Sequence, residues 1–299
     1  MKKLIFLILL IASAIIVDAQ SNIRVNNYWQ NPYYINPAAI DEDYTTVFSV
    51  AARKQWFGFE GAPGTLFATA RTFISPLNTQ FGLKVFTDKI GYTNTSNVAL
   101  SYAYSVMFNR DWRLNFGINA SYQNVADNTE DINYDVQSDP SIYMTQLPEN
   151  NYNCDLGAQF SGKGLNVGIS TQNIFSLFFD ENISQSNTNY FYAIYHHQST
   201  YPVNLQIGIA AIQYVKMFQM EVNFTTYFDI NNQPEVLDLG LFYRTKNEMG
   251  AIAGVKLNDT FHLSYSYDFA FTGISRYSVG THELMLTYKF NKQKYRPQL

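Results

Sequence analysis

The four histidines and the single cysteine are the residues best suited to metal binding or nucleophilic catalysis, but their spacing supports neither. His196 and His197 are adjacent, so in a strand their side chains point to opposite faces and cannot hold one metal ion together. Cys154 has no second cysteine for an internal disulfide, and no base or orienting group stands out for a catalytic thiol. We therefore expect no catalytic, metal-binding or cofactor-binding residues.

Two further patterns favour ordinary structure over chemistry. The run Asp41-Glu42-Asp43 has the carboxylates of a calcium site, but a solvated turn is the expected structure. Gly58 and Gly61 have the spacing of a phosphate loop, yet no change from strand to helix surrounds them. No Ser/His/Asp set suggests a triad, and the lipase-type G-x-S-x-G is absent. The sequence therefore predicts a protein that is not an enzyme.

The hydrophobic pattern of the chain has a period of two. Residues 260–271, TFHLSYSYDFAF, place a large apolar or aromatic side chain at every second position, with polar or small residues between. This pattern predicts an extended strand with one apolar and one polar face. The same alternation predicts fourteen strands, at 44–53, 64–74, 79–87, 94–108, 112–124, 152–160, 163–172, 189–196, 202–214, 217–228, 235–245, 248–257, 260–270 and 282–290.

Composition and strand length favour a membrane barrel over a soluble sandwich, which would show similar alternation. Charged residues make up 15% of the chain, against roughly 25% in a typical globular protein, whereas aromatic residues make up 16%. Many predicted strands exceed the usual length of about 5–6 residues and suit a tilted membrane crossing of about 9–11. We predict an all-β fold, a transmembrane antiparallel β-barrel of about 14 strands.

The N-terminus has the pattern of a secretory signal peptide. Two lysines precede an apolar run over residues 4–17, and Val17-Asp18-Ala19 resembles a small-residue cleavage site. We expect cleavage between Ala19 and Gln20, which removes residues 1–19 and exports the chain. No basic stripe suggests nucleic-acid binding. The predicted location is the outer membrane, with the lipid bilayer as the first partner.

The mature chain divides into an irregular N-terminal segment, 20–43, and one barrel with a short C-terminal tail, 44–299. The pattern does not decide whether the lumen is open or is filled by the N-terminal segment. Long connections are expected at 125–151 and 173–188 and tight ones at 161–164 and 244–248, as in barrels with long loops on one rim.

The connection after the first strand, RKQWFGFEGAPGT, is rich in glycine and aromatic residues. Its aromatic cluster is consistent with a plug that folds inward or with a contact to another protein. The residues that we select as a candidate partner contact are Arg53, Gln55, Trp56, Phe57, Phe59, Glu60 and Pro63.

Motifs along the whole mature chain resemble one family, the PorP/SprF membrane proteins of the type IX secretion system from the Bacteroidetes. The matching stretches, in order, are NPYYINPAA (31–39), RKQWFGFEGAP (53–63), DKIGYT (88–93), SYAYSV (101–106), GLFYR (240–244), SYSYDFAFTGIS (264–275) and GTHELMLTYKF (280–290). Each stretch alone is a weak signal, whereas the ordered set is specific.

The resemblance implies an outer-membrane barrel without catalytic activity that supports the secretion or surface attachment of cargo proteins with C-terminal sorting domains. It also implies association with the periplasmic PorK/PorN ring and a peptidoglycan-binding partner, and in some members a role with one adhesin in gliding motility. The alternatives left open are a porin or hydrophobic-solute channel, and an outer-membrane enzyme such as a lipid A modifier.

Overall fold

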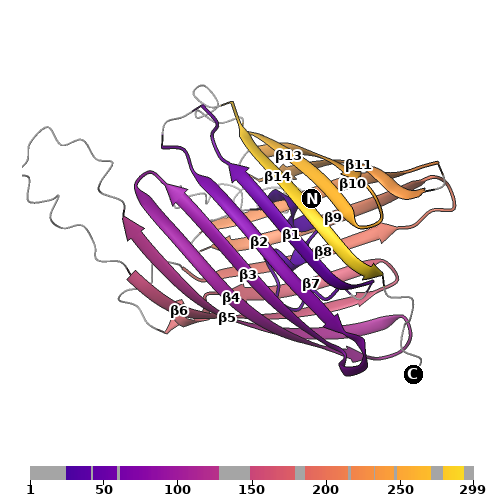
Figure 1. Cartoon of the computed structure of the whole chain (residues 1–299), viewed down its shortest axis with the longest axis horizontal. Helices are drawn as coiled ribbons and strands as arrows, with labels where there is room; N and C mark the ends of the chain where they lie inside the picture. Colours follow the sequence, from indigo (N-terminus) through magenta and orange to yellow (C-terminus); the bar gives the residue numbers. More distant parts are fainter. Residues whose placement is uncertain are drawn as a thin grey trace, which may run out of the picture.

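The computed structural model describes residues 25–41, 43–58, 61–127, 149–178, 186–214, 217–231, 233–245, 248–270 and 279–292. These residues form fourteen strands in one closed antiparallel barrel, in which each strand pairs with its neighbours in sequence (Figure 1). The barrel closes where β1 (Tyr44–Lys54) pairs with β14 (Thr281–Lys292). The predicted fold class is confirmed. Among the described residues, no helix has the length and apolar character needed to cross a membrane.

Every predicted strand corresponds to one observed strand, and the differences lie at strand ends. The observed β6 begins three residues earlier than predicted and β3 ends three residues later, because backbone pairing continues through polar residues beyond the apolar pattern. The other strands are β2 (Gly64–Ile74), β3 (Thr79–Ile90), β4 (Thr93–Met107), β5 (Trp112–Asp127), β6 (Glu149–Gly162), β7 (Leu165–Gln172), β8 (Thr188–His197), β9 (Val203–Tyr214), β10 (Met217–Ile230), β11 (Gln233–Arg244), β12 (Glu248–Lys256) and β13 (Phe261–Ala270).

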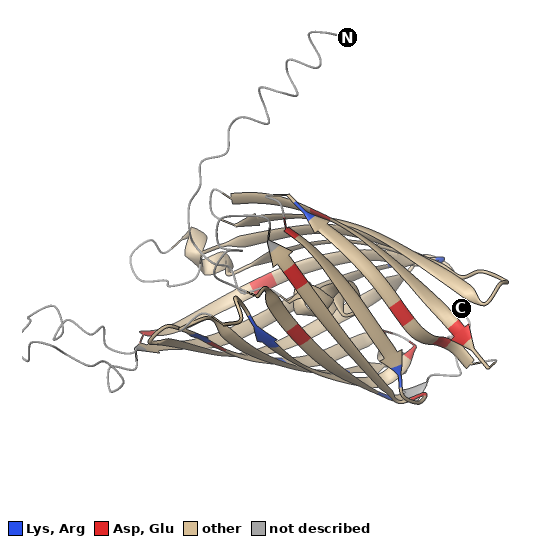
Figure 2. Ribbon diagram, turned by 90° about the horizontal axis from the view of Figure 1, so that it is seen from above, with Lys and Arg blue, Asp and Glu red and all other residues tan. Residues whose placement is uncertain are grey.

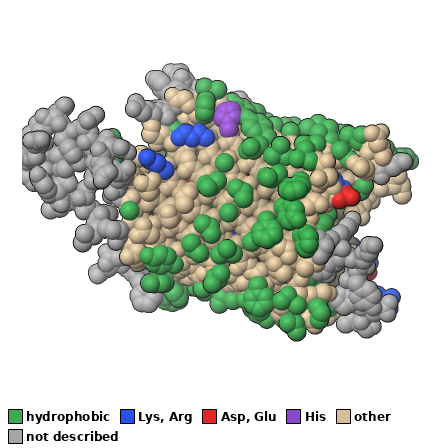
Figure 3. All heavy atoms as spheres, in the orientation of Figure 1, with side chains coloured by type: hydrophobic (Ala, Val, Ile, Leu, Met, Phe, Trp, Pro, Cys, Tyr) green, Lys and Arg blue, Asp and Glu red, His purple; other side chains and the backbone are tan. Residues whose placement is uncertain are grey.

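The two faces of the wall differ as the alternation predicts. On β13 the side chain of Tyr265 is 41% exposed on the outer face, whereas Ser264 and Ser266 are buried in the interior. Figure 3 shows hydrophobic side chains spread over the viewed outer face and charged side chains only toward its ends. Figure 2 marks acidic and basic residues part-way along the strands. The acidic residues Glu221 of β10 and Asp238 of β11 are buried. The apolar outer face suits lipid.

The outer face provides a test of membrane depth at Leu100, in the middle of β4 and 65% exposed. Leu100→Arg is expected to destabilise the barrel by about 2–4 kcal/mol, because it places a charge near the bilayer midplane. Phe108→Arg, just beyond the end of β4, is the matched control and is expected to cost about 0–1 kcal/mol. Urea unfolding in lipid vesicles measures both, and equal costs would contradict this position of β4 in the bilayer.

The two rims of the barrel carry different connections. At one rim, which we call the long-connection rim, the chain between β5 and β6 spans 128–148, and long connections also follow β7 and β13. At the opposite, short-turn rim, no connection exceeds the five residues 198–202. Most of the predicted loop 125–151 lies outside the described residues. Three tight connections also occur at the long-connection rim, including that between β11 and β12. Long loops are typically extracellular in such barrels.

The N-terminal segment lies inside the barrel. It contains two short 3-10 turns, η1 (Asn26–Trp29) and η2 (Pro32–Tyr34), and Figure 2 shows its coiled ribbon within the ring of strands. Tyr33 is fully buried and Trp29 nearly so. The largest apolar core cluster forms where this segment packs against the inner wall. We call residues 25–41 the plug.

Candidate functional site: the plugged lumen

The plug crosses the lumen from one rim to the other. Near the long-connection rim, the backbone N–H of Asn26 donates to Glu283 Oε2 at 2.8 Å, close to the start of β14. Near the short-turn rim, Asp41 forms an ion pair with Arg71 at 3.2 Å, close to the end of β2. The chain then enters β1 at the short-turn rim. The first described residue, Val25, therefore lies toward the long-connection rim.

Five charged residues of the wall gather beside the start of the plug, and we call them the charged cluster: Arg53, Glu221, Arg244, Asp268 and Glu283. Arg53 lies 3.2 Å from Asp268 and 3.3 Å from Glu283. Arg244 pairs with Glu221 and lies 3.2 Å from Asp268. All five are buried, although they come from β1, β10, β11, β13 and β14. Such buried charges require partners, which the cluster and the plug supply.

The charged cluster binds the first residues of the plug directly. Glu283 accepts hydrogen bonds from the backbone N–H groups of both Asn26 and Asn27, and from the Asn27 side chain at 2.7 Å. The Asn26 carboxamide accepts from Arg244 at 2.7 Å, and the indole N–H of Trp29 donates to Glu221 at 2.6 Å. Removing the plug would therefore leave several charged groups without their hydrogen-bond partners.

Glycines of the wall make room for the plug. A Cβ at Gly208 would lie 2.3 Å from the Trp29 ring, and one at Gly82 would lie 2.0 Å from the Tyr33 hydroxyl. A Cβ at Gly117 would lie 2.4 Å from the backbone nitrogen of Ala38. These contacts are too short for any other residue without a shift. The inner wall is therefore shaped for this segment along its whole length.

Further polar contacts of the plug are spread around the barrel. Gln30 donates to Asp238 Oδ2 at 2.7 Å, and the Ile35 carbonyl accepts from Ser170 at 2.7 Å. The Asn36 carboxamide donates to the Ala158 carbonyl at 3.1 Å. The hydrogen bonds of the wall to the plug thus involve mainly peptide and carboxamide groups of the plug, in addition to the apolar cluster.

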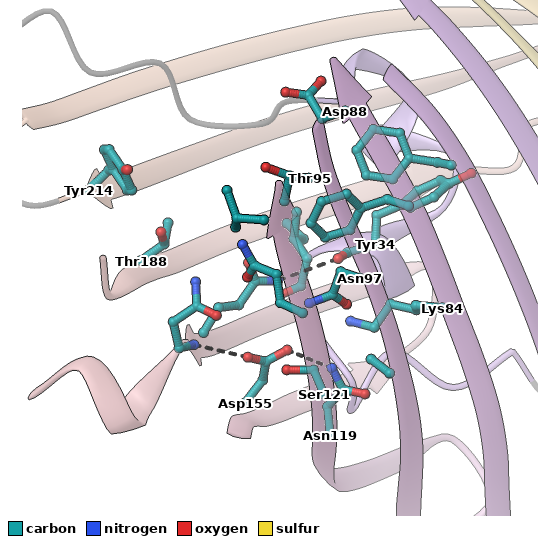
Figure 4. Close-up of a pocket in the computed structure, with 18 of the residues that line it drawn as sticks. Tyr34, Lys84, Asp88, Thr95, Asn97, Asn119, Ser121, Asp155, Thr188 and Tyr214 are labelled. Atoms are coloured by element: carbon teal, nitrogen blue, oxygen red, sulfur yellow. Dashed lines mark hydrogen bonds between the residues drawn. The ribbon is translucent and has the colours of Figure 1, made fainter. Parts of the chain in front are cut away.

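A cavity remains beside the plug, toward the long-connection rim, and we call it the vestibule. Its volume is about 300 Å³, and the plug residues Tyr34 and Ile35 contribute to its lining (Figure 4). Figure 4 shows Lys84 and Asn97 pointing into this space from β3 and β4. Asp155 accepts from Asn119 Nδ2 at 2.6 Å and from the Asn173 backbone at 3.0 Å.

The histidines do not converge on one site. His196 Nε2 lies 2.9 Å from Glu235 Oε1, and His262 Nε2 lies 2.6 Å from Asp238 Oδ1, in separate pairs. His282 is hydrogen-bonded instead to the Tyr265 hydroxyl, which belongs to the outer face. Among the described residues, no group of three or more His, Cys, Asp or Glu side chains is arranged to hold a metal ion.

The predicted partner-contact residues separate into different environments. Arg53 is buried in the charged cluster, and Pro63 is buried as well. Phe57 is 52% exposed and packs edge-on against His282 at the long-connection rim. Gln55 and Trp56 are half-buried beside it, whereas the predicted contacts Phe59 and Glu60, like Ala19 and Gln20 of the cleavage site, lie outside the described residues.

Sequence reasoning did not identify the charged cluster as a site, although a signal for it exists. Glu221, Asp238 and Asp268 interrupt strands whose opposite faces are mostly apolar. A charge at such a position in a membrane barrel must face the lumen, where water or a protein partner solvates it. The pattern therefore places these residues in the lumen, but it does not show whether water or a segment of the chain fills it.

Comparison with known proteins connects the whole barrel to one family. The sequence profile described as "Type IX secretion system membrane protein PorP/SprF" matches residues 17–288. Among solved structures, the toluene transporter TbuX of Ralstonia pickettii is similar, with a TM-score of 0.50 and 8% identity over 86% of this chain and 93% of that one. The outer-membrane protein Omp33 of Acinetobacter baumannii has a TM-score of 0.46 and 8% identity, over 83% and 99%. At this identity the likeness concerns the fold alone. No curated protein matches the chain.

Proposed function

Since this chain belongs to the PorP/SprF family of type IX secretion system membrane proteins, we propose that it supports the secretion or surface attachment of cargo proteins with C-terminal sorting domains. In this role the barrel is an integral outer-membrane scaffold without enzymatic activity. Its cleaved signal peptide, its PorK/PorN and peptidoglycan-binding partners, its Bacteroidetes host and a role in gliding motility belong to the same proposal.

The observation that carries the proposal is the plugged lumen. A porin conducts through a water-filled interior. Here the charged side chains that would line such a pore hold the plug instead, as Glu283 and Arg244 do through Asn26. This use of the charged cluster supports a scaffold whose recognition surfaces lie at the rims. The charged groups hold the plug in place, which supports a structural role for them and not a catalytic one.

The alternative function is an outer-membrane channel for small or hydrophobic solutes. The observation that favours a channel is that a single peptide segment, the plug, blocks the lumen. Displacement of such a segment would open a pore. Conductance of the intact protein in a planar bilayer separates the two functions. A large and steady conductance favours the channel, whereas a closed barrel favours the scaffold.

The experiment that tests the proposal compares the secreted and surface proteomes of the host with and without this gene. Loss of one or a few proteins with sorting domains would identify a dedicated cargo partner. Loss of all such proteins would indicate a core component of the secretion system. An unchanged set of secreted and surface proteins would refute the proposal and favour the channel.

A further inference from the structure

The vestibule has a wall of polar groups that no described residue uses. Two rows of side chains line it from neighbouring strands, one on β4 and one on β5. Four of these side chains form no hydrogen bond with any described residue: Thr95, Asn97, Ser121 and Gln123. Asn97 and Gln123 are nonetheless buried, and the buried Oδ1 of Asn119 also has no partner among the described residues. Buried polar groups normally have partners, so this wall is suited to a polar ligand.

The spacing of these groups fits an extended peptide. Within each row the side chains are two residues apart, so they repeat about every 6.6–6.8 Å along the strand. An extended peptide presents its own backbone groups to one side with the same repeat. The plug shows that this inner wall binds peptide through carboxamide, hydroxyl and carboxylate groups, as Asn26 does on Ser266 and Asp268. The vestibule offers the same chemistry without an occupant from the described residues.

Lys84 is the basic side chain among the described residues that line the vestibule, and Asp88 and Asp155 are the acidic ones. Asp155 already accepts two hydrogen bonds, and Asp88 accepts one from Thr65. Lys84 forms no ion pair with any described residue, and its Nζ lies over the Tyr33 ring, 5.2 Å from the centroid. Because the partly exposed Lys84 ammonium has no ion-pair partner among the described residues, it can form a charge-assisted hydrogen bond with a carboxylate that enters the cavity.

We propose that the vestibule binds a short extended segment of a partner protein, which enters from the long-connection rim and places a carboxylate on Lys84. The carboxylate is either the C-terminus of the partner or an Asp or Glu side chain within the segment. A cavity of about 300 Å³ is at the small end of ligand sites, so only a short stretch enters. The inference rests on the proposed function, because the partner is the cargo that the barrel supports.

The test uses a photo-reactive amino acid at position 121 in living cells of the host, with position 122 as the control. Ser121 lines the vestibule, whereas Tyr122 is 41% exposed on the outer face of the same strand. We expect position 121 to cross-link to a segment of a secreted protein and position 122 not to do so. Mass spectrometry of the adduct then shows whether the segment is the C-terminal end or an internal acidic stretch.

Substitution of Lys84 makes the test specific. Lys84→Met is expected to lower the cross-link yield about tenfold, the equivalent of one lost charge-assisted hydrogen bond, whereas Lys84→Arg retains most of it. Lys89→Met is the matched control, since Lys89 lies on the outer face of the same strand. Gel mobility of the unheated protein confirms that each variant forms a barrel.

Each outcome decides the inference. It is overturned if adducts form only within this chain, if none form, or if Lys84→Met and Lys89→Met give equal yields. The proposed function fails separately, when loss of the gene leaves the secreted and surface proteins unchanged. A third outcome separates the two proposals. Suppose that loss of the gene abolishes cargo secretion, whereas the Lys84→Met strain still secretes the cargo and gives no adduct at position 121. The proposed function then stands, and the vestibule is not the site that carries it.

Discussion

Deleting residues 25–40 is expected to turn the closed barrel into an open channel. The plug fills the lumen of a barrel whose strand number, fourteen, lies between the side-chain-filled barrels of about eight strands and the porins of about 16–18. Without it, the charged cluster would face water, which solvates the freed groups and keeps the lumen wet. Single-channel conductance in a planar bilayer is expected to rise at least about tenfold over the intact protein.

A point substitution tests the same idea without shortening the chain. Gly117→Leu is expected to displace the plug, because a Cβ there would already lie 2.4 Å from the Ala38 nitrogen. Ala120→Leu is the control, since Ala120 lies on the outer face of the same strand. We expect conductance to rise in Gly117→Leu and to stay at the wild-type level in Ala120→Leu. If the deletion variant forms barrels that do not conduct, the plug is not what blocks the lumen.

The barrel was predictable because lipid and lumen impose opposite requirements on alternate residues. Along β13, Tyr265 must suit lipid, whereas Ser264 and Ser266 must suit the interior. Each strand shows this alternation in its own sequence, so each can be predicted separately. Strand number and order follow, because neighbouring strands in sequence pair in space. Strand ends were less predictable, since backbone pairing continues where the side-chain pattern stops.

The plug and its site were not predictable in the same way. The hydrogen bond between Asn26 and Glu283 joins residues 257 positions apart, and no local pattern encodes it. Arg53 illustrates the difference. Its sequence neighbours group it with a contact loop, although it shares the inward face of β1 with Ser49 and Ala51. Strict use of the two-residue period places it in the lumen.

Arg244→Met is expected to cause the largest loss of stability from a single substitution. Arg244 is almost fully buried and contacts Glu221, Asp268 and Asn26. Its removal leaves the two carboxylates with less positive charge in a site closed to water. Breaking a buried ion pair from one side costs about 3–5 kcal/mol, because the remaining charge stays buried without compensation. Urea unfolding in detergent or vesicles measures the change in the free energy of unfolding.

Two further variants separate the ion pair from general damage to the barrel. Lys163→Met removes the surface pair with Asp111, whose side chains are 64% and 49% exposed, and is expected to cost about 0–1 kcal/mol. Glu221→Gln in the Arg244→Met background removes the carboxylate charge that has lost its arginine partner. This second substitution is expected to recover part of the lost stability. If the double variant is as unstable as the sum of the two single variants, Glu221 and Arg244 are not coupled.

Arg244 should also control how firmly the plug is held. It binds Asn26 directly and orients Glu221, which accepts the indole N–H of Trp29. Loss of Arg244 therefore weakens both anchors at the start of the plug while leaving the glycine contacts further along unchanged. With Trp56 and Trp112 replaced by phenylalanine, so that Trp29 alone emits, we expect the fluorescence to shift toward that of a hydrated indole in Arg244→Met before the barrel itself unfolds. If Arg244→Met instead keeps the wild-type emission wavelength until one unfolding transition, the plug and the barrel unfold as one unit. The charged cluster would then stabilise both together.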